Sequence, residues 1–218
     1  MVSKKQKYII GIDEVGRGAL AGNVTVAAVA IAANSKFNPP AGGQNSKLKL
    51  KDSKKLTPKQ RETWFKWIKN YRHKSAICYA VANVSPKAID KINISKAANL
   101  AATKAFNKLV LKFNKSTSLK GSTIFLDGGL YLNTKHKIQD TRYKIQTIIR
   151  GDEKIPAISL ASNVAKVSRD RQMKNLHKKY PQYGFKNHKG YGTKWHFRAI
   201  KKHGPSKIHR LTFLKKMR

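Results

Sequence analysis

Near the N-terminus, an apolar segment leads directly into two adjacent acidic residues and then into a glycine-rich turn. The apolar residues of Tyr8–Ile12 predict a buried strand and those of Val24–Ala33 a second one, so Asp13 and Glu14 are expected where the first strand ends. A carboxylate at the edge of a hydrophobic core is costly unless it is paired or bound to a metal ion. The pair therefore indicates either a functional site or two acids that cap a turn.

The turn that follows the acids favours the functional interpretation. Gly16, Gly18 and Gly22 allow the backbone to turn sharply and to approach a ligand closely. Arg17, between the first two glycines, is the nearest cation in the sequence. We therefore expect the whole segment to form one site.

The charge of the chain indicates its partner. The 218 residues include 47 Lys and Arg against 10 Asp and Glu, a formal net charge of +37, which favours a polyanion and above all nucleic acid. An anionic membrane is the alternative, but no apolar run approaches the roughly 18 residues needed to span a bilayer, and residues 1–7 lack a signal-peptide core. The single cysteine, Cys78, is expected to be buried. It excludes a disulfide framework, so a cytoplasmic location is expected.

Two further acids are expected at strand ends. The apolar segment Ser122–Leu126 predicts a strand that ends on Asp127, and Tyr143–Ile149 predicts another that is followed by Asp152. Together with Asp13 and Glu14 they give four carboxylates that strands of one sheet can bring close together. Their mutual repulsion would raise some of their pKa values unless a divalent cation neutralises them, and oxygen ligands suit Mg²⁺ or Mn²⁺.

Other segments predict an α/β architecture. We expect a third strand over Ser75–Val84, a helix from Thr57 to about Asn70, a long helix after Ser85 and a closely packed helix over Ile155–Arg171. The segment Phe37–Leu50 is expected to be an exposed loop. Four of the remaining acids are interpreted as structural or surface residues, and they are Asp52, Asp90, Asp140 and Asp170.

The motif Asp-Glu followed by Gly-Arg-Gly closely resembles the N-terminal motif of ribonuclease HII, the type 2 ribonuclease H family. The sister family, ribonuclease HIII, usually has Gly-Lys-Gly there, so Arg17 favours the first assignment. The resemblance runs from about residue 8 to residue 214 through several further motifs, namely Asp-Ser-Lys-Lys-Leu (52–56), Ala-Lys-Val-x-Arg-Asp-Arg (165–171), His-Lys-Gly-Tyr-Gly-Thr (188–193) and His-Arg-x-Thr-Phe (209–213). The spacing from Asp127 to Asp152 is longer than usual, which implies an insertion around Lys135–Arg142, and Asn163 replaces an apolar residue of the family, which suggests an extra polar contact or a change in packing.

The resemblance implies a ribonuclease H-like mixed sheet flanked by helices. The catalytic domain would span residues 1–180, and a basic, helical C-terminal extension that contacts nucleic acid would span 181–218. The implied activity is hydrolysis of the RNA strand of RNA/DNA hybrids and incision 5′ to single ribonucleotides in duplex DNA, with two Mn²⁺ or Mg²⁺ ions and products with 5′-phosphate and 3′-hydroxyl ends. The metal ligands and catalytic residues would be Asp13, Glu14, Asp127 and Asp152.

The resemblance also implies residues that recognise the substrate. Gly16, Arg17, Gly18 and Tyr191 would read the 2′-hydroxyl at the junction of RNA and DNA, with Tyr183 as the competing tyrosine. Ahead of the first helix, Ser53, Lys54 and Lys55 are candidates for binding a phosphate or are simply a solvated basic loop.

Several alternatives stay open at this point. The protein is expected to be a monomer, and the other functions considered are a ribonuclease HIII-like enzyme and a non-catalytic basic protein that binds nucleic acid. Four C-terminal histidines lie in basic segments where phosphate contact is plausible, and they have no assigned role: His188, His196, His203 and His209.

Overall fold

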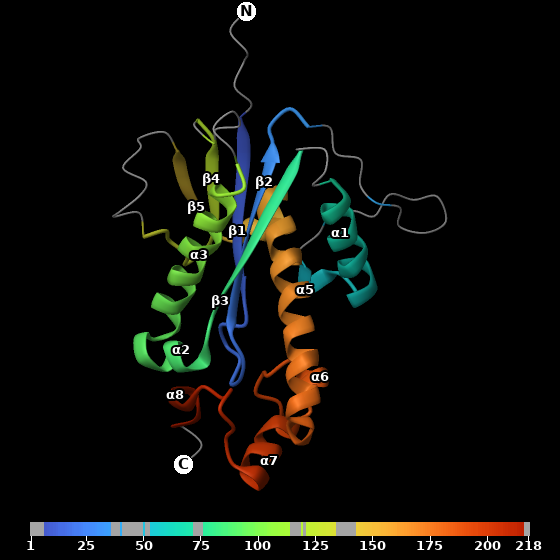
Figure 1. Cartoon of the computed structure of the whole chain (residues 1–218), viewed down its shortest axis with the longest axis vertical. Coiled ribbons are helices and arrows are strands. Elements are labelled where there is room, and N and C mark those ends of the chain that lie inside the picture. The colour runs from blue at the N-terminus through green and yellow to red at the C-terminus, as the bar shows by residue number, and fades with distance from the viewer. Residues whose placement is uncertain are drawn as a thin grey trace, which may run out of the picture.

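A five-stranded mixed sheet lies at the centre of the structure, with helices on both of its faces (Figure 1). The computed structural model describes residues 7–35, 40, 50, 53–71, 76–113, 119, 121–133 and 143–215. The strands are β1 (Tyr8–Val15), β2 (Val24–Ala32), β3 (Ile77–Val84), β4 (Thr123–Asp127) and β5 (Lys144–Ile148). They are ordered β3-β2-β1-β4-β5, with β2 antiparallel to β1 and β3, and β4 parallel to β1 and β5. The predicted mixed α/β sheet is confirmed.

Helices of very different length surround the sheet. The helices are α1 (Pro58–Tyr71), α2 (Pro86–Ile92), α3 (Ile94–Val110), α4 (Gly151–Lys154), α5 (Pro156–Lys179), α6 (Phe185–His188), α7 (Lys194–His203) and α8 (Leu211–Leu214), with 3₁₀ turns at η1 (Ser53–Lys55) and η3 (Pro181–Tyr183). Among the described residues, no helix is both long and apolar enough to cross a membrane. The predicted loop Phe37–Leu50, apart from Pro40 and Leu50, and the predicted insertion Lys135–Arg142 lie outside the described residues.

The pairing of β1 explains where the acidic residues lie. We predicted that this strand ends at Ile12, but it continues to Val15 because β2 pairs with it along its whole length. On its other side, the parallel pairing with β4 stops at Ile12 opposite Leu126. The next residue of each strand is an aspartate, so Asp13 and Asp127 adjoin at the point where these two strands separate.

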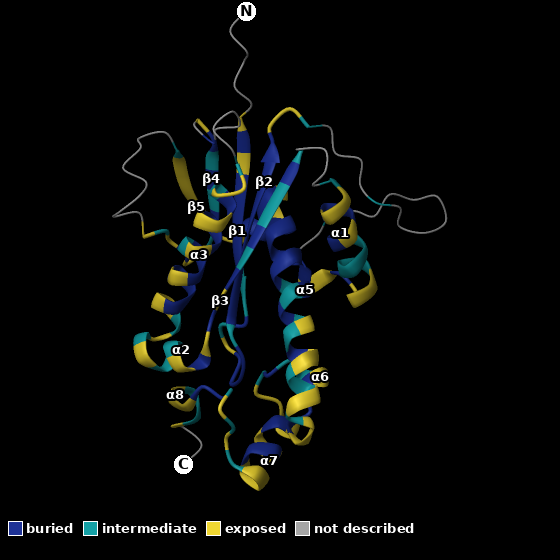
Figure 2. Cartoon of the chain, viewed as in Figure 1, coloured by how far each residue is buried: buried dark blue, intermediate teal, exposed yellow. Residues whose placement is uncertain are grey.

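The two faces of the sheet are covered by different helices. Ile10 and Ile12 of β1 belong to a core with α3, whereas Ala27 and Val29 of β2 belong to a second core with α1 and α5. A Cβ atom at Gly11 would come within 2.1 Å of the carbonyl carbon of Ala157, so glycine at this position lets α5 approach the sheet closely. Figure 2 shows α5 buried where it crosses the sheet and more exposed toward its C-terminal end.

The C-terminal segments pack against the lower half of α5 (Figure 1). A third hydrophobic cluster joins the turn after β1 to these segments and consists of Leu20, Ala21, Met173, Tyr183, Phe185, Ala199 and Ile200. The boundary predicted at residue 180 falls where α5 ends, at Lys179. The division of the chain into a catalytic domain and an extension stays a prediction.

Two local predictions were wrong, and one of the two alternatives for Asn163 is not found. The long helix after Ser85 is two helices, because Asn93 has a positive φ of 66° and its side chain caps α3 by accepting a hydrogen bond from the N–H of Lys96 (3.0 Å). Cys78 is only partly buried. Asn163 is fully buried, yet neither its Nδ2 nor its Oδ1 atom has a hydrogen-bond partner, so the predicted polar contact is not found among the described residues.

Candidate active site

Three of the four predicted carboxylates meet at the ends of two neighbouring strands. Oxygen atoms of Asp13, Glu14 and Asp127 all lie within 4.8 Å of one another. Asp13 is buried, and the Glu14 side chain is 10% exposed. The protein thus concentrates three of its few acidic side chains in one partly enclosed place, which is the arrangement expected for a metal site.

Burial and mutual repulsion disfavour the charged forms of these acids. The pKa of Asp13 is raised well above its ordinary value by burial and then by the neighbouring charges of Glu14 and Asp127. Burial also raises the pKa of Glu14, although the guanidinium of Arg17, 3.2 Å from its Oε1 atom, acts in the opposite direction. A divalent cation would remove this repulsion.

The hydrogen bonds of the three acids leave room for such a cation. Oδ1 of Asp13 accepts a hydrogen bond from the N–H of Glu14 (2.7 Å), and Oδ1 of Asp127 accepts one from the N–H of Gly151 (2.8 Å). The Oε2 atom of Glu14 is buried and has no hydrogen-bond partner in the part of the chain that the structure describes. A buried carboxylate oxygen without a donor is costly, and a hard cation is the ligand that would satisfy it. The residues therefore fit Mg²⁺ or Mn²⁺.

Asp152 follows β5, as predicted. It lies in the first turn of α4, because the backbone turns at Arg150, whose φ is 55°. It is buried, its Oδ2 atom is 3.7 Å from Nζ of Lys54, and it is not one of the three acids within 4.8 Å. Its neighbour Gly151 connects it to the group through the hydrogen bond to Asp127. Its role as a fourth ligand stays a prediction.

The two glycines of the Gly-Arg-Gly turn differ in what the structure requires at their positions. Gly16 has a positive φ of 89°, and a Cβ atom there would come within 2.5 Å of Nε of Arg169, so the fold itself requires glycine. Gly18 is exposed, it is not among the glycines with positive φ, and a Cβ atom would meet nothing within 4 Å. Neither the backbone nor the packing of the protein explains glycine at position 18.

Two buried arginines hold this turn in place. Arg210 donates to the carbonyl oxygen of Arg17 (2.7 Å) and twice to that of Gly22 (3.0 and 2.9 Å). Arg169 donates to the carbonyl oxygens of Ala21 (3.1 Å) and Lys189 (3.1 Å). Both arginines are fully buried, and their partners are backbone carbonyls rather than acids. The sequence contained both residues within motifs that resemble the family, but nothing in those motifs reveals a positioning role.

Tyr191 lies near the Gly-Arg-Gly turn and is accessible to a substrate, whereas Tyr183 is not. The ring of Tyr191 is partly exposed, with the guanidinium carbon of Arg169 6.0 Å from its centroid. Tyr183 is 2% exposed, and its hydroxyl donates to the carbonyl oxygen of Gly204 (2.7 Å). A ring that is buried and already hydrogen-bonded cannot contact a substrate, so the structure favours Tyr191.

Hydrogen bonds between two buried histidines lead to the backbone of Tyr191. The N–H of Ser206 donates to Nδ1 of His209 (2.9 Å), so this ring carries its proton on Nε2. That Nε2 lies 3.1 Å from Nε2 of His196, and Nδ1 of His196 lies 2.9 Å from the carbonyl oxygen of Tyr191. One set of tautomers satisfies every contact, in which His209 donates to His196 and His196 donates to Tyr191.

These histidines are structural and do not contact phosphate. His196 is 0% exposed and His209 is 2% exposed, which excludes the phosphate contact considered for them from the sequence. Burial, stronger than their hydrogen bonds, lowers the pKa of each to about 4, so both rings are neutral at physiological pH. The sequence did not predict that these side chains face inward, because both histidines lie in a basic segment.

The segment before α1 matches its prediction only in part. Ser53 was predicted as a candidate for binding a phosphate. It is 3% exposed and its hydroxyl lies 2.8 Å from that of Ser162, so it is not available to a phosphate. Its short side chain packs against α5, which explains its burial. Lys54 and Lys55 are exposed and lie close to Asp152 and Glu153, at 3.7 and 2.7 Å respectively. Their phosphate-binding role stays a prediction.

The remaining described acids are structural, as expected. Asp90 accepts hydrogen bonds from the backbone N–H groups of Leu211 (2.9 Å) and Thr212 (3.0 Å) and thereby caps α8. Asp170 lies 3.0 Å from Nζ of Lys166 and 3.9 Å from Nη2 of Arg61. Asp52 and Asp140 lie outside the described residues.

A mixed sheet that brings carboxylates together at adjoining strand ends is the arrangement of the ribonuclease H-like fold. Solved structures share the fold: the ribonuclease H2 from Pyrococcus horikoshii OT3 has a TM-score of 0.66 at 24% identity and covers 96% of each chain. The Bst ribonuclease HIII in complex with Mn²⁺ has a TM-score of 0.62 at 17% identity, covering 95% of this chain and 67% of that one.

Sequence comparison specifies the family. The family model of Ribonuclease HII matches residues 10–216, and Ribonuclease HII of Caldicellulosiruptor bescii is 39% identical over 215 residues, which are 99% of this chain and 90% of the relative. The chain belongs to the ribonuclease HII family, as Arg17 had indicated. It is therefore a ribonuclease H, a metal-dependent hydrolase, and the two alternatives considered from the sequence, a ribonuclease HIII and a non-catalytic binding protein, are set aside.

Proposed function

We propose that this ribonuclease H incises duplex DNA on the 5′ side of single embedded ribonucleotides in addition to hydrolysing the RNA strand of hybrids. The observation that carries the proposal is Gly18, an exposed glycine four residues after Glu14 that has ordinary backbone geometry and open space around it. Glycine at such a position allows a ligand to approach the backbone closely. A ribose 2′-hydroxyl, which both donates and accepts hydrogen bonds, is a ligand that backbone groups can read.

The acidic cluster supplies the proposed chemistry. Asp13, Glu14 and Asp127, with Asp152 as the predicted fourth ligand, would hold Mn²⁺ or Mg²⁺, and the Mn²⁺ in the solved ribonuclease HIII supports manganese. When bound, two such ions would activate a water and stabilise the leaving 3′ oxygen of the phosphodiester. Products would carry 5′-phosphate and 3′-hydroxyl ends.

The protein's own residues orient these acids. The guanidinium of Arg17 donates to Oε1 of Glu14, and Oε2 of the same carboxylate has no donor among the described residues. The N–H of Gly151 holds Oδ1 of Asp127 in the same way, and a Cβ atom at Gly151 would come within 2.4 Å of Cδ1 of Ile158. Preorganised ligands of this kind lose little freedom when the cation and the substrate bind.

The substrate would lie across the Gly-Arg-Gly turn and Tyr191. The backbone of Gly16, Arg17 and Gly18 would read the 2′-hydroxyl, while the partly exposed ring of Tyr191 would pack on the sugar or base of the junction. Lys54 and Lys55 lie beside Asp152 and would contact a flanking phosphate. The field of the +37 net charge would supply general affinity for the duplex.

The test is the ratio of two cleavage rates. In Tyr191→Ala, cleavage at a single embedded ribonucleotide should slow by about tenfold to a hundredfold, because base or sugar stacking on an aromatic ring stabilises by about 1–3 kcal/mol. Cleavage of an uninterrupted RNA/DNA hybrid should slow less, because a hybrid offers many sites without a junction. Both rates are measured with Mn²⁺ at one fixed salt concentration.

Gly18→Ala is the companion variant, since the structure has room for the added methyl group. It should fold normally and lose cleavage at the embedded ribonucleotide. If Tyr191→Ala slows both substrates equally and Gly18→Ala slows neither, the proposed reading of the junction is wrong.

A further inference from the structure

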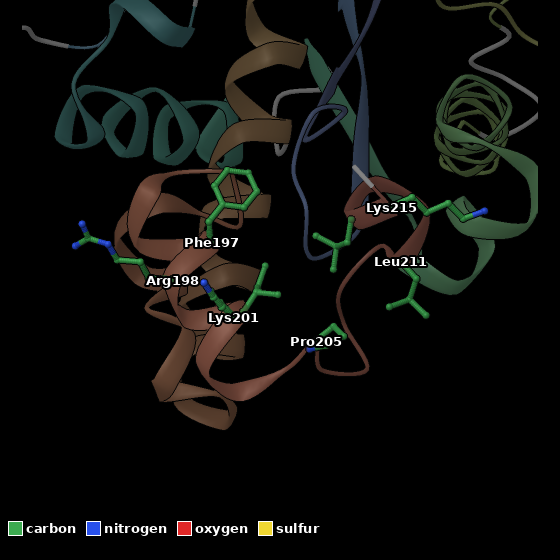
Figure 3. Close-up of a pocket in the computed structure, with 8 residues that line it drawn as sticks. Phe197, Arg198, Lys201, Pro205, Leu211 and Lys215 are labelled. Carbon is green, nitrogen blue, oxygen red and sulfur yellow. The ribbon is translucent and has the colours of Figure 1, made fainter. Parts of the chain in front are cut away.

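An apolar groove of about 650 Å³ lies between α7 and α8, away from the acidic cluster (Figure 3). Helix α7 contributes one side of the groove, α8 the other, and Pro205 lies on the segment that joins them. The lining residues are Phe197, Arg198, Ile200, Lys201, Pro205, Leu211, Leu214 and Lys215. None of them belongs to the carboxylate cluster, to the Gly-Arg-Gly turn or to the residues that hold Tyr191, so the groove is separate from the active site.

Leu211 of α8 is not needed for the fold. This helix has no buried residue, and Leu211 is 57% exposed. The helix is anchored by other contacts, because Asp90 caps it and Phe213 and Leu214 pack against the hydrophobic clusters. Leu211 and Leu214 both line the groove. An exposed leucine at a concave apolar surface of a highly charged protein is typical of an interaction site.

The charges at the groove are of one sign. Arg198, Lys201 and Lys215 are exposed at its rim, and none of its eight lining residues is acidic. A partner that fills the apolar floor would therefore gain from negative charges that flank its apolar side chains. The apolar residues of the lining suit partner side chains such as Leu, Ile or Phe.

We infer that this groove binds a short acidic segment of another protein, which inserts two or three apolar side chains between α7 and α8. A nucleic-acid strand fits less well, because single strands are bound by stacking on aromatic rings and Phe197 is the one aromatic residue in the lining. Such a segment would bring the enzyme to its site of action without occupying the active site. The inference does not depend on which ribonucleotide substrate is cleaved.

Binding of labelled peptides to the full-length protein tests this assignment. The first probe is a fluorescein-labelled peptide of Asp and Glu residues that flank Leu and Phe, and the second has the same charges with Ser in place of the apolar residues. Because the protein is so basic, charge alone will bind both, and the difference between them reports the groove. The apolar peptide should bind about tenfold more tightly at physiological salt.

Variants locate the binding. Leu211→Ser should remove most of the difference between the two peptides, whereas Leu111→Ser, at an 84% exposed leucine outside the groove, should leave it intact. Lys201→Glu should weaken both peptides, and hybrid cleavage by Leu211→Ser should equal that of the wild type. The assignment is overturned if both peptides bind wild type equally, if Leu111→Ser has the same effect as Leu211→Ser, or if Leu211→Ser weakens a fluorescein-labelled oligo(dT) and not the apolar peptide.

Discussion

Two regions of this protein bury charged or ionisable groups, and they satisfy them in opposite ways. In the acidic cluster three carboxylates face one another, and one buried oxygen of Glu14 has no hydrogen-bond partner among the described residues. Around the Gly-Arg-Gly turn, Arg210 and Arg169 donate to backbone carbonyls, and His196 and His209 complete a chain to Tyr191. The first region is incomplete without a cation. The second is complete in the sense that both guanidinium groups are hydrogen-bonded to carbonyls and need no ligand, although Nε of Arg169 is buried without a partner in the part of the chain that the structure describes. A buried cluster therefore marks a ligand site where like charges face one another, and not wherever a charge is buried.

The largest effect should follow from breaking the incomplete region. Asp13→Asn should abolish turnover while leaving duplex binding largely intact, because the acids hold the metal and the lysines hold the phosphates. Cleavage assays and fluorescence anisotropy with a labelled duplex measure the two properties. Asp170→Asn is the matched control, since Asp170 lies in partly buried ion pairs outside the carboxylate cluster and should retain activity. Normal turnover by Asp13→Asn would remove the assignment of the metal site.

The next largest effect should follow from breaking the complete region. Arg210→Lys should lower the free energy of unfolding by about 3 kcal/mol, because an ammonium cannot reach the carbonyls of both Arg17 and Gly22 and stays buried. Urea denaturation of the metal-free protein measures it. Arg198→Lys, at an exposed position, should change stability by less than about 0.5 kcal/mol. Equal stability of the two variants would show that Arg210 does not hold the turn.

The complete region should also give the protein a pH dependence at mildly acidic pH. His196 and His209 have pKa values of about 4 in the folded protein against an ordinary value of 6.5, so the unfolded chain binds protons first as the pH falls. Stability should therefore decrease from about pH 6.5 toward pH 4, by on the order of 1 kcal/mol for each histidine. Urea midpoints across this range should show a shallower decrease in His209→Gln than in the exposed control His203→Gln. The same slope in both would contradict the neutral pair.

The smallest effect concerns the acidic cluster without metal. Removing one negative charge from Asp13 should leave the stability of Asp13→Asn in EDTA equal to that of the wild type or higher by up to ~1 kcal/mol, because the pKa of Asp13 is raised by burial and by its neighbours. The expected change in stability thus has the opposite sign to that of Arg210→Lys. Thermal denaturation in EDTA measures it. A large loss of stability would show that Asp13 supports the fold, as an acid that only caps a turn would.

The sequence predicted the sheet and the position of its acids well, for physical reasons. Long apolar runs such as Val24–Ala32 fit only a strand buried on both faces, and a carboxylate directly after such a run has few structural explanations. This is why Asp13, Glu14 and Asp127 were found. The end of β1 was misplaced because it depends on pairing with β2, which no local pattern contains.

Features set by long-range contacts or unusual backbone geometry could not be predicted in this way. Asn93 divides a predicted helix through a positive φ. Arg150 also has a positive φ, and it turns the chain from β5 into α4 just before Asp152. His196 and His209 are polar residues in a basic segment, and only the packing of α7 against the turn after β1 shows that they face inward. The orientation of such side chains depends on partners far away in the sequence.

The bond between Arg210 and Gly22 joins residues 188 positions apart, and this separation orders the events of synthesis. At roughly 5–20 residues per second, a ribosome needs about 10–40 s after Gly22 to produce Arg210. During that interval β1 can already pair with β2, and the acids are already part of the chain. The turn still lacks the hydrogen bonds from Arg210 that hold it. The nascent chain therefore contains all three acids of the cluster before the Gly-Arg-Gly turn acquires the hydrogen bonds of Arg210, and the geometry of that turn is fixed only when the C-terminal segment has been synthesised.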